Sequence, residues 1–441
     1  LRRRSVSSWR APRLRSPIHA KVSIPGSKSQ TARALYLAAI DRQPCVIEGV
    51  LRSRDTDLFA QALRTLGAQI DMLGDSCVRV TPISSDFLSS ERVIDCGLAG
   101  TVMRFLPPLA ALSSTPTRFD GDEQAYVRPL APLLDVLEGL GASLIYHGEK
   151  GHLPFTISGP LTPPSSPIIV DASASSQFFS AMLLIAPLIG GAIIRSNAPL
   201  ISLPHIEMTL EMMQEVGLSW MRLGDREWKV DAGAPTTSEI AIEADLSNAG
   251  PFLCAGILSA GSVTIPNWPL ASTQPGAQWP SLFAEIGIET SLETNEMGSS
   301  ELTVRGGGPG SFPGIERDMS AMGEMVPTLA ALLLFASSPS TLTGIAHLRG
   351  HETDRLDAIA QSVSALGGSI EQLPDGLRIT PTALHGAHLR SFADHRMATF
   401  AAIVGLVVDG VSVDDISCTS KTLPGFESMW ARMCAESGDN V

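Results

Sequence analysis

A sixfold internal repeat constrains the fold of this 441-residue chain more than any other feature. Each copy has a strand-like lead, a turn of small or polar residues and an Ala/Leu-rich helix. The copies begin near Ser27, Leu98, Ser173, Ser247, Ser320 and Asp394, at successive offsets of 71, 75, 74, 73 and 74 residues. This period is longer than that of the common solenoid repeats. It predicts small α/β subdomains, each with strands and two helices, grouped into two lobes.

The helices expected in these repeats are of two kinds. The first helix of a repeat is apolar nearly all round, as in residues 101–106 and 177–182, which is typical of a buried, central helix. The second helix ends in an apolar residue followed by glycine, and we expect that glycine to end the helix in the left-handed conformation. These pairs are Leu66-Gly67, Leu140-Gly141, Val216-Gly217, Leu366-Gly367 and the looser Ile286-Gly287.

The composition narrows the class of protein. Hydrophobic residues make up 44% of the chain and charged residues 17%, which is typical of a globular protein. The formal net charge of −13 argues against a nucleic-acid partner, and no uninterrupted apolar run predicts a membrane span. The six cysteines are scattered without a C-x-x-C pair. This fits a reduced protein, and we expect a cytoplasmic location.

The start of the chain differs from the rest. The first forty residues contain no Asp or Glu, and arginines crowd the beginning at Arg2, Arg3, Arg4, Arg10, Arg13 and Arg15. A transit peptide, a translated stretch upstream of the true start and a disordered extension all fit this composition. We expect a short disordered extension. A linker is expected at residues 231–238, a stretch of small and polar residues between the third and fourth repeats.

The first repeat contains a candidate anion site. A Pro-Gly pair predicts a tight turn after a short strand, and Ser27 or Ser29 can cap the helix that follows. A helix N-terminus attracts anions, and Lys28 adds a full positive charge there. Ser29 and Arg33 are four residues apart and therefore lie on one helix face. The pattern predicts capture of a phosphate or carboxylate. The alternative is an ordinary capped surface helix with solvated cations.

Chemically distinctive side chains recur at the turns of the other repeats. Gly100 begins a helix with Arg104 one turn in, and the polar residues 175–177 begin another. Later turns carry Glu324 in an apolar helix start, four ionisable residues in the stretch 351–355, the cluster Asp394-His395-Arg396, and Lys421. An acid in an apolar helix start is costly unless it has a partner or a function. Each residue alone could be a cap or a solvated charge, but their recurrence at equivalent positions predicts convergence on one cleft.

Taken together, these motifs closely resemble those of the 5-enolpyruvylshikimate-3-phosphate synthase family. The matching stretches are residues 25–29, 99–101, 128–129, 175–177, 352–355, 394–398 and 421–422, in the family's order and spacing. The resemblance implies a two-lobed α/β fold of six βαβαββ units, three per lobe, with the first strand packed in the C-terminal lobe. We therefore expect an extension and first strand in residues 1–25, an N-terminal lobe in 26–240 and a C-terminal lobe in 241–441.

The resemblance also implies an activity, which is transfer of the enolpyruvyl group from phosphoenolpyruvate to the 5-hydroxyl of shikimate 3-phosphate with release of phosphate. Neither a metal nor another cofactor is required, and we expect a monomer with no nucleic-acid or membrane partner. The family also binds glyphosate beside shikimate 3-phosphate in the phosphoenolpyruvate position. Gly100 leaves room there, whereas tolerant members commonly carry Ala. Phe105 stands in place of a Pro on the same helix.

Roles for the substrate-binding residues follow from the same resemblance. The shikimate carboxylate would be held by Ser29 and Arg33, and the shikimate phosphate by Ser175, Ser176 and Ser202. Arg355 and Arg396 would grip the phosphoenolpyruvate carboxylate, a planar anion suited to the guanidinium fork. The departing phosphate would be surrounded by the Gly100 amide, Arg128, Gln177, Lys28 and Lys421. His351 is included among the residues that bind substrate.

The reaction explains the acidic residues of the set. The 5-hydroxyl must lose a proton as it attacks the enol carbon, the enol methylene must gain one, and these steps reverse during elimination. Glu324 is the expected base, and Glu352 and Lys28 are candidates for the other proton transfers. Clustered cations would stabilise the leaving phosphate and bring two polyanions together.

Several positions depart from the commonest family pattern. Glu324 replaces an Asp, His351 a Lys, His347 an Asn and Leu98 an Asn, and one bacterial branch shares these four changes. Ala32 replaces an Asn common even there, and nothing in the sequence explains it. His347 and His351 also have the i, i+4 spacing of a metal pair, but no convincing third ligand lies nearby in the sequence.

Two other functions compete with this interpretation. The related UDP-N-acetylglucosamine enolpyruvyl transferases use a catalytic cysteine in the loop before their Arg-Pro pair and lack the Lys-Ser-x-x-x-Arg pattern. Here the corresponding loop, residues 121–128, contains no cysteine, and residues 28–33 have that pattern. The second alternative is a non-catalytic repeat scaffold whose cations are solvated.

Overall fold

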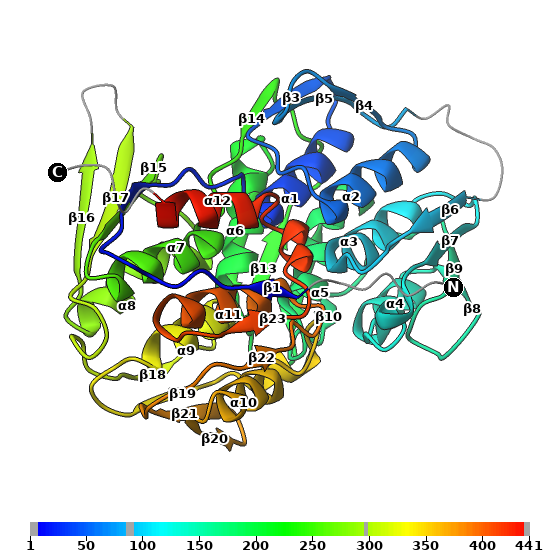
Figure 1. Cartoon of the computed structure of the whole chain (residues 1–441). Coiled ribbons are helices and arrows are strands. Elements are labelled where there is room, and N and C mark those ends of the chain that lie inside the picture. The colour runs from blue at the N-terminus through cyan, green and yellow to red at the C-terminus, as the bar shows by residue number, and fades with distance from the viewer. Residues whose placement is uncertain (1–7, 85–91, 295–298, 436–441) are drawn as a thin grey trace. The chain divides into compact units, whose positions relative to one another are not determined.

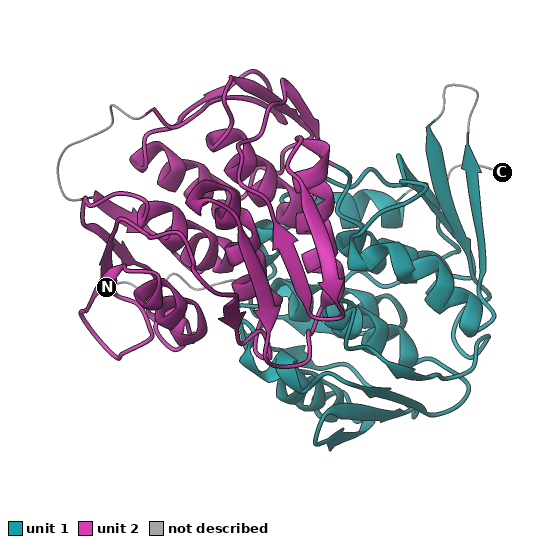
Figure 2. Cartoon of the chain, turned by 180° about the vertical axis from the view of Figure 1, so that it is seen from behind, with its two compact units in different colours: residues 1–25, 243–441 teal, residues 26–242 magenta. Residues whose placement is uncertain are grey.

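The computed structural model of the chain describes residues 8–84, 92–294 and 299–435. The chain forms two compact units, each with three copies of the repeat (Figure 2). Unit 1 comprises residues 1–25 and 243–441, and unit 2 comprises residues 26–242. Within the described ranges, no helix is long and apolar enough to cross a membrane.

Each repeat contributes two helices (Figure 1). The first helices are almost wholly buried, as expected; they are α1 (Lys28–Ala39), α3 (Gly100–Ala110), α5 (Ser176–Ile185), α7 (Leu246–Leu258), α9 (Val326–Leu333) and α11 (His395–Val407). The second helices are α2 (Arg54–Thr65), α4 (Ala131–Gly139), α6 (Leu203–Glu215), α8 (Trp279–Glu285), α10 (Arg355–Ala365) and α12 (Phe426–Ala435). Short 3-10 helices are η1 (Glu123–Ala125), η2 (Ala186–Ile189), η3 (Pro275–Gln278), η4 (Gly323–Met325), η5 (Ala346–Gly350) and η6 (Ser417–Lys421).

The strands of the described residues form six small sheets, three in each unit. In unit 2 the sheet orders are β14 (Glu239–Ala241)-β3 (Cys45–Glu48)-β5 (Cys77–Thr81)-β4 (Gln69–Met72), β6 (Arg92–Asp95)-β7 (Thr117–Asp120)-β9 (Phe155–Ser158)-β8 (Ser143–Tyr146), and β10 (Ile168–Val170)-β11 (Ala192–Ser196)-β13 (Glu227–Val230)-β12 (Trp220–Gly224). In unit 1 they are β16 (Glu289–Thr294)-β17 (Ser300–Arg305)-β15 (Ser262–Pro266)-β2 (His19–Lys21), β18 (Glu316–Asp318)-β19 (Ser340–Thr343)-β21 (Gly376–Thr380)-β20 (Ser369–Leu373), and β1 (Trp9–Arg10)-β23 (Ser412–Val413)-β22 (His388–Leu389).

All five four-stranded sheets follow one plan. The first two strands of a repeat pair in parallel, as β10 does with β11, and the last two form an antiparallel hairpin that joins the sheet through its second member. Parallel neighbours need a crossover, and in the second, third and fifth repeats the first helix provides it, as α5 does between β10 and β11. These βαβαββ units confirm the fold class predicted from the sequence.

The first and fourth repeats exchange their first strands: the strand that precedes each repeat in the chain belongs to the sheet of the other. β2 pairs in parallel with β15 in unit 1, whereas β14 pairs in parallel with β3 in unit 2. The chain therefore enters unit 2 after Pro25 and leaves it after Ile242. Residues 231–238, the expected linker, lie inside unit 2 because β14 follows them and still belongs to the sheet of the first repeat.

We expected the arginine-rich start to be a disordered extension, but from residue 9 onward this expectation is wrong, because the chain forms a strand there. β1 pairs antiparallel with β23 and supplies the third strand of the smallest sheet. Its neighbour Ala11 is buried and donates its N–H to the Val411 carbonyl at 3.0 Å. Strand pairing and burial of a small apolar residue stabilise this segment in spite of its composition. The remaining part of that expectation, residues 1–7, lies outside the described residues.

Glycines end five of the second helices as predicted. Gly67, Gly141, Gly217, Gly287 and Gly367 all have positive φ, from +72° to +110°. Each places the helix end in the left-handed region, where glycine has no Cβ penalty.

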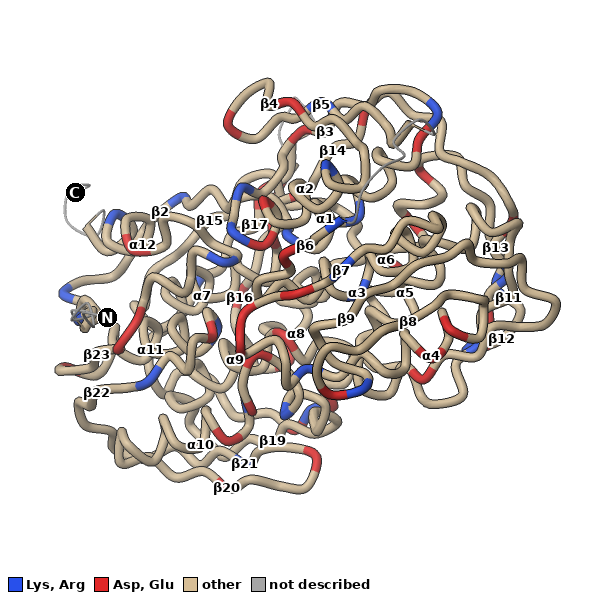
Figure 3. The backbone as a smooth tube through the Cα atoms, turned by 90° about the vertical axis from the view of Figure 1, so that its right-hand side faces the viewer, with Lys and Arg blue, Asp and Glu red and all other residues tan. Residues whose placement is uncertain are grey.

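Each unit has its own aromatic-rich core. In unit 2, Phe179 meets Trp228 with ring centroids 5.4 Å apart, and in unit 1 Phe252 lies 5.9 Å from Phe426 and 5.5 Å from Trp430. Outside the cores, Lys and Arg are interspersed with Asp and Glu along the backbone (Figure 3). The buried polar side chains of each unit, such as Arg33 and Arg355, stand out against these apolar cores.

Candidate active site

The helix start of α1 presents the first group of candidate residues. Ser27 is the N-cap, and its hydroxyl accepts from the Gln30 N–H at 3.4 Å, so Ser27 rather than Ser29 caps this helix. Lys28 is the first helical residue, and its Nζ lies 3.5 Å from the Asp55 carboxylate in the first turn of α2. The turn before it requires glycine, since a Cβ on Gly26 would lie 1.8 Å from the Gly49 carbonyl oxygen.

Arg33 lies one turn further along α1, and its guanidinium has a fixed position. Nη1 donates to the Ser29 carbonyl at 2.9 Å, Nη2 donates to the His205 carbonyl at 2.9 Å, and Nε donates to Thr209 Oγ1 at 2.7 Å. The guanidinium carbon also lies 5.2 Å from the centroid of the Phe105 ring. Ser29 and Arg33 therefore share one helix face, as the spacing predicted.

A second group surrounds the start of α3. Arg104 Nη1 donates to Gln177 Oε1 at 2.8 Å, and Arg128 Nη1 donates to the Leu98 carbonyl at 3.2 Å. A Cβ on Gly100 would lie 2.9 Å from Arg104 Nη1 and 3.2 Å from both Arg128 Nη2 and Gln177 Oε1. The structure thus brings Gly100, Arg128 and Gln177 together from two repeats. Arg104 joins them, and the only signal for it was its place one turn after Gly100.

The predicted phosphate-binding serines lie at two further helix starts of unit 2. Ser175 is the N-cap of α5, where its hydroxyl accepts from the Gln177 N–H at 3.3 Å, and Ser176 is the buried first residue of the same helix. Ser202 precedes α6 with φ +50° and makes no side-chain cap hydrogen bond. A left-handed conformation is uncommon for a serine and concentrates at functional sites.

In unit 1, Arg355 is the centre of a buried network of charges. Nε donates to Asp394 Oδ2 at 2.7 Å, Nη2 donates to Asp394 Oδ1 at 3.2 Å and to Glu352 Oε2 at 2.5 Å, and Nη1 lies 3.2 Å from His351 Nδ1. Lys421 Nζ donates to the other Glu352 oxygen at 2.7 Å. Four predicted site residues, namely His351, Glu352, Arg355 and Lys421, therefore lie in one network.

Asp394 holds this network together, although we did not predict a role for it. Its carboxylate is fully buried, binds Arg355 bidentately and also accepts from the Arg396 N–H at 2.8 Å as the N-cap of α11. Burial lowers the pKa of Arg355, but the charges of Asp394 and Glu352 outweigh it and raise that pKa above its ordinary value. The sequence pointed to Asp394 only as a member of the cluster Asp394-His395-Arg396 and of the matching stretch 394–398, and gave it no role of its own.

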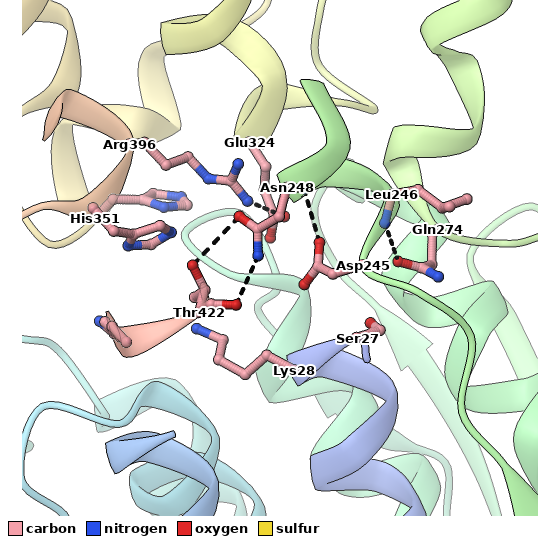
Figure 4. A network of polar contacts seen from close by, with 12 residues as sticks. Ser27, Lys28, Asp245, Leu246, Asn248, Gln274, Glu324, His351, Arg396 and Thr422 are labelled. Carbon is pink, nitrogen blue, oxygen red and sulfur yellow. Dashed lines mark hydrogen bonds and ion pairs between the residues drawn. The ribbon is translucent and has the colours of Figure 1, made fainter. Parts of the chain in front are cut away.

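Glu324 and Arg396 point toward each other from η4 and α11 (Figure 4). Arg396 Nη2 donates to Glu324 Oε2 at 3.0 Å. The Arg396 side chain is 8% exposed, and that of Glu324 is 28% exposed. The acid predicted as the base is therefore held by a nearly buried cation and remains partly accessible.

The segment after Lys421 is fixed to α7 by side chains that we did not single out. Asn248 Nδ2 donates to the Thr422 carbonyl at 2.9 Å, and Thr422 Oγ1 donates to Asn248 Oδ1 at 3.4 Å (Figure 4). Asp245 caps α7 by accepting from the Asn248 N–H at 3.0 Å. This arrangement sets the backbone that carries Lys421.

The two histidines with metal-pair spacing lie close together, with ring centroids 5.8 Å apart between His347 and His351. Burial lowers the pKa of His347 below its ordinary value, and the charge of Arg355 lowers it further. Within residues 8–84, 92–294 and 299–435, no group of three or more His, Cys, Asp or Glu residues is arranged to hold a metal ion.

His347 should make the folded protein sensitive to mild acid. Its pKa is lower folded than unfolded, so below about pH 6.5 the unfolded chain binds more protons and stability falls as the pH falls. Between pH 7.5 and pH 5.5, we expect the melting temperature of His347→Asn to fall by less than that of the parent protein. The control is His388→Asn, which changes an exposed histidine of unit 1. Equal losses in parent and His347→Asn would contradict this expectation.

The chain has the fold of solved enolpyruvyl transferases. A solved EPSP synthase from Acinetobacter baumannii is 21% identical with a TM-score of 0.79, covering 97% of each chain. The enolpyruvyl transferase NikO from Streptomyces tendae is 16% identical with a TM-score of 0.74, covering 97% of this chain and 96% of its own.

Sequence comparison narrows this class to one family. Residues 12–430 match the EPSP synthase family, that is, 3-phosphoshikimate 1-carboxyvinyltransferase. The 3-phosphoshikimate 1-carboxyvinyltransferase of Kocuria rhizophila is 45% identical over 440 residues, covering 98% of this chain and 97% of the relative. That of Bifidobacterium longum is 44% identical over 443 residues, covering 98% and 99%. The chain belongs to the EPSP synthase family.

Proposed function

We propose that this chain transfers the enolpyruvyl group of phosphoenolpyruvate to the 5-hydroxyl of shikimate 3-phosphate and releases phosphate. Membership of the EPSP synthase family supports the reaction. The observation that carries the proposed chemistry is the Glu324–Arg396 pair, in which a nearly buried guanidinium holds a partly exposed carboxylate at 3.0 Å. Such a carboxylate can accept a proton from a bound hydroxyl.

Shikimate 3-phosphate is assigned to residues of unit 2. Ser29 and Arg33 share one face of α1 and suit its carboxylate, whereas Ser175, Ser176 and Ser202 lie at helix starts and suit its phosphate. The three hydrogen bonds on Arg33 support this role, because a guanidinium that is already oriented loses less entropy on binding.

Phosphoenolpyruvate is assigned to two sets of residues, one for its carboxylate and one for its phosphate. Arg355 and Arg396 would hold its carboxylate, and His351 lies against Arg355 in the same network. Lys28, Arg128, Gln177, Lys421 and the Gly100 amide would surround its phosphate. Cations that are positioned in advance stabilise the charge that develops on a leaving phosphate.

The reaction then proceeds by addition and elimination. Glu324 takes the 5-hydroxyl proton while the oxygen bonds to the enol carbon, and a proton from Lys28 or Glu352 is added to the methylene. In elimination a methyl proton returns to the enzyme, the carbon–phosphate oxygen bond breaks, and the enolpyruvyl ether and phosphate are formed. Glu352 bridges Arg355 and Lys421, which fixes its two oxygens for this exchange.

The acceptor distinguishes this proposal from its alternatives. We expect purified protein to release phosphate from phosphoenolpyruvate when shikimate 3-phosphate is present and not when UDP-N-acetylglucosamine replaces it. Phosphate release is measured colorimetrically, with each substrate omitted in turn as the control. Release with the nucleotide sugar alone would favour the related transferase, and no release with either acceptor would favour a non-catalytic scaffold. The monomeric state and the cytoplasmic location remain predictions.

A further inference from the structure

We infer that Thr209, on α6, is a positioning residue that orients the Arg33 guanidinium for the shikimate 3-phosphate carboxylate. The inference rests on the role proposed for Arg33. It adds a residue outside the recurring helix starts, in the second turn of α6, the second helix of its repeat. All the contacts that carry it lie within unit 2.

The hydroxyl of Thr209 has a defined direction. Thr209 Oγ1 donates to the His205 carbonyl at 2.9 Å, one turn earlier in α6, or to Ser180 Oγ of α5 at 3.1 Å. A hydroxyl has one proton to donate and two lone pairs that accept. With its proton committed to either partner, Thr209 offers a lone pair to Arg33 Nε, and that bond is short, at 2.7 Å.

This bond holds the Nε of the guanidinium. The two terminal nitrogens donate to the Ser29 and His205 carbonyls, and Nε donates to the Thr209 hydroxyl. The Phe105 ring lies 5.2 Å from the guanidinium carbon and limits its tilt. Arg33 is 2% exposed and Thr209 is fully buried, so water cannot replace a lost hydroxyl without a rearrangement.

Removing the hydroxyl should therefore weaken binding of one substrate. Thr209→Val keeps the shape of the side chain but removes the hydroxyl to which the buried Nε–H donates, a loss that is felt where the group cannot reach water. We expect the KM for shikimate 3-phosphate to rise about tenfold, and the KM for phosphoenolpyruvate to change by less than about twofold. Thr209→Ser restores the acceptor and should restore the parent KM.

A double-mutant cycle separates positioning from general packing. Arg33→Met removes the guanidinium without leaving a large cavity and should itself raise the KM for shikimate 3-phosphate. On that background, Thr209→Val should have little further effect, because its consequence acts through Arg33. The matched control is Thr117→Val, which removes another buried threonine hydroxyl of unit 2, one bonded to the Thr115 carbonyl. Melting temperatures are recorded for every variant.

The possible outcomes are distinct. A normal shikimate 3-phosphate KM in Thr209→Val, with a raised KM in Arg33→Met, would overturn the inference and leave the role of Arg33 intact. An equal rise on both backgrounds, or in both substrates, would mean that Thr209 serves only the packing of α6. A normal KM in Arg33→Met would instead refute the proposed role of Arg33. If Thr209→Val does not fold, Thr209→Ala and titration calorimetry with shikimate 3-phosphate alone give the same comparison.

Discussion

Replacing Glu324 with glutamine is expected to lower kcat by about a hundredfold or more, while the KM of each substrate changes much less. Glutamine has the size of glutamate and can still accept a hydrogen bond from Arg396, which lies 3.0 Å from Glu324 Oε2. It cannot take the proton of the 5-hydroxyl. The loss should therefore appear in the chemical step rather than in binding, and steady-state kinetics with each substrate varied in turn measures both.

Two further variants make the result specific to the base. Glu324→Asp keeps a carboxylate that can take the proton, so it should keep far more activity than Glu324→Gln. Glu371→Gln changes an exposed acid of β20 in the same unit and should leave kcat unchanged. A Glu324→Gln enzyme with near-normal kcat would remove Glu324 from the mechanism.

Replacing Gly100 with alanine is expected to raise the inhibition constant of glyphosate about tenfold or more. The new methyl group would lie 2.9 Å from Arg104 Nη1 and 3.2 Å from Arg128 Nη2 and Gln177 Oε1. These atoms are the ends of flexible side chains, so the protein can fold around the methyl group and the displaced cations then narrow the anion site. The KM for phosphoenolpyruvate should rise by a smaller factor, because phosphoenolpyruvate is the shorter molecule.

Inhibition is measured against phosphoenolpyruvate at saturating shikimate 3-phosphate, and we expect the parent enzyme to be inhibited competitively. Gly139→Ala is the matched control, since a Cβ on this glycine of α4 meets no atom within 4 Å. An unchanged inhibition constant in Gly100→Ala would mean that this glycine does not border the inhibitor.

The elements that were predictable are those set by local chemistry. The buried first helices followed from apolar residues on all sides, and the left-handed helix ends followed from glycines such as Gly67 and Gly217. The strand β1 was not predictable from local sequence, because it depends on pairing with β23, about 400 residues away. No local pattern encodes a partner at that distance.

The same division applies to the candidate site. Residues that begin a helix in the repeat, such as Lys28 and Ser175, have a local signature. Asp394 has this signature too, as the N-cap of α11, but nothing local shows that it binds Arg355. Asn248 and Thr209 act on Thr422 and Arg33, which belong to other elements, and no local pattern shows these pairs. Their residue types are ordinary at helix caps and on helix faces. Only the tertiary structure shows which functional residue each of them orients.

The exchange of β2 and β14 determines when each part of the chain can be completed during synthesis. Strand β2 emerges from the ribosome first among the strands of its sheet, but its partner β15 is made about 240 residues later. The sheet of the first repeat likewise lacks one edge until β14 has been made. Residues 26–242 can therefore close all three of their sheets before β15, the third strand of unit 1 in chain order, has been made. Unit 2 is therefore expected to fold first on a growing chain. Strands β1 and β2 stay unpaired until their partners β23 and β15 have been made.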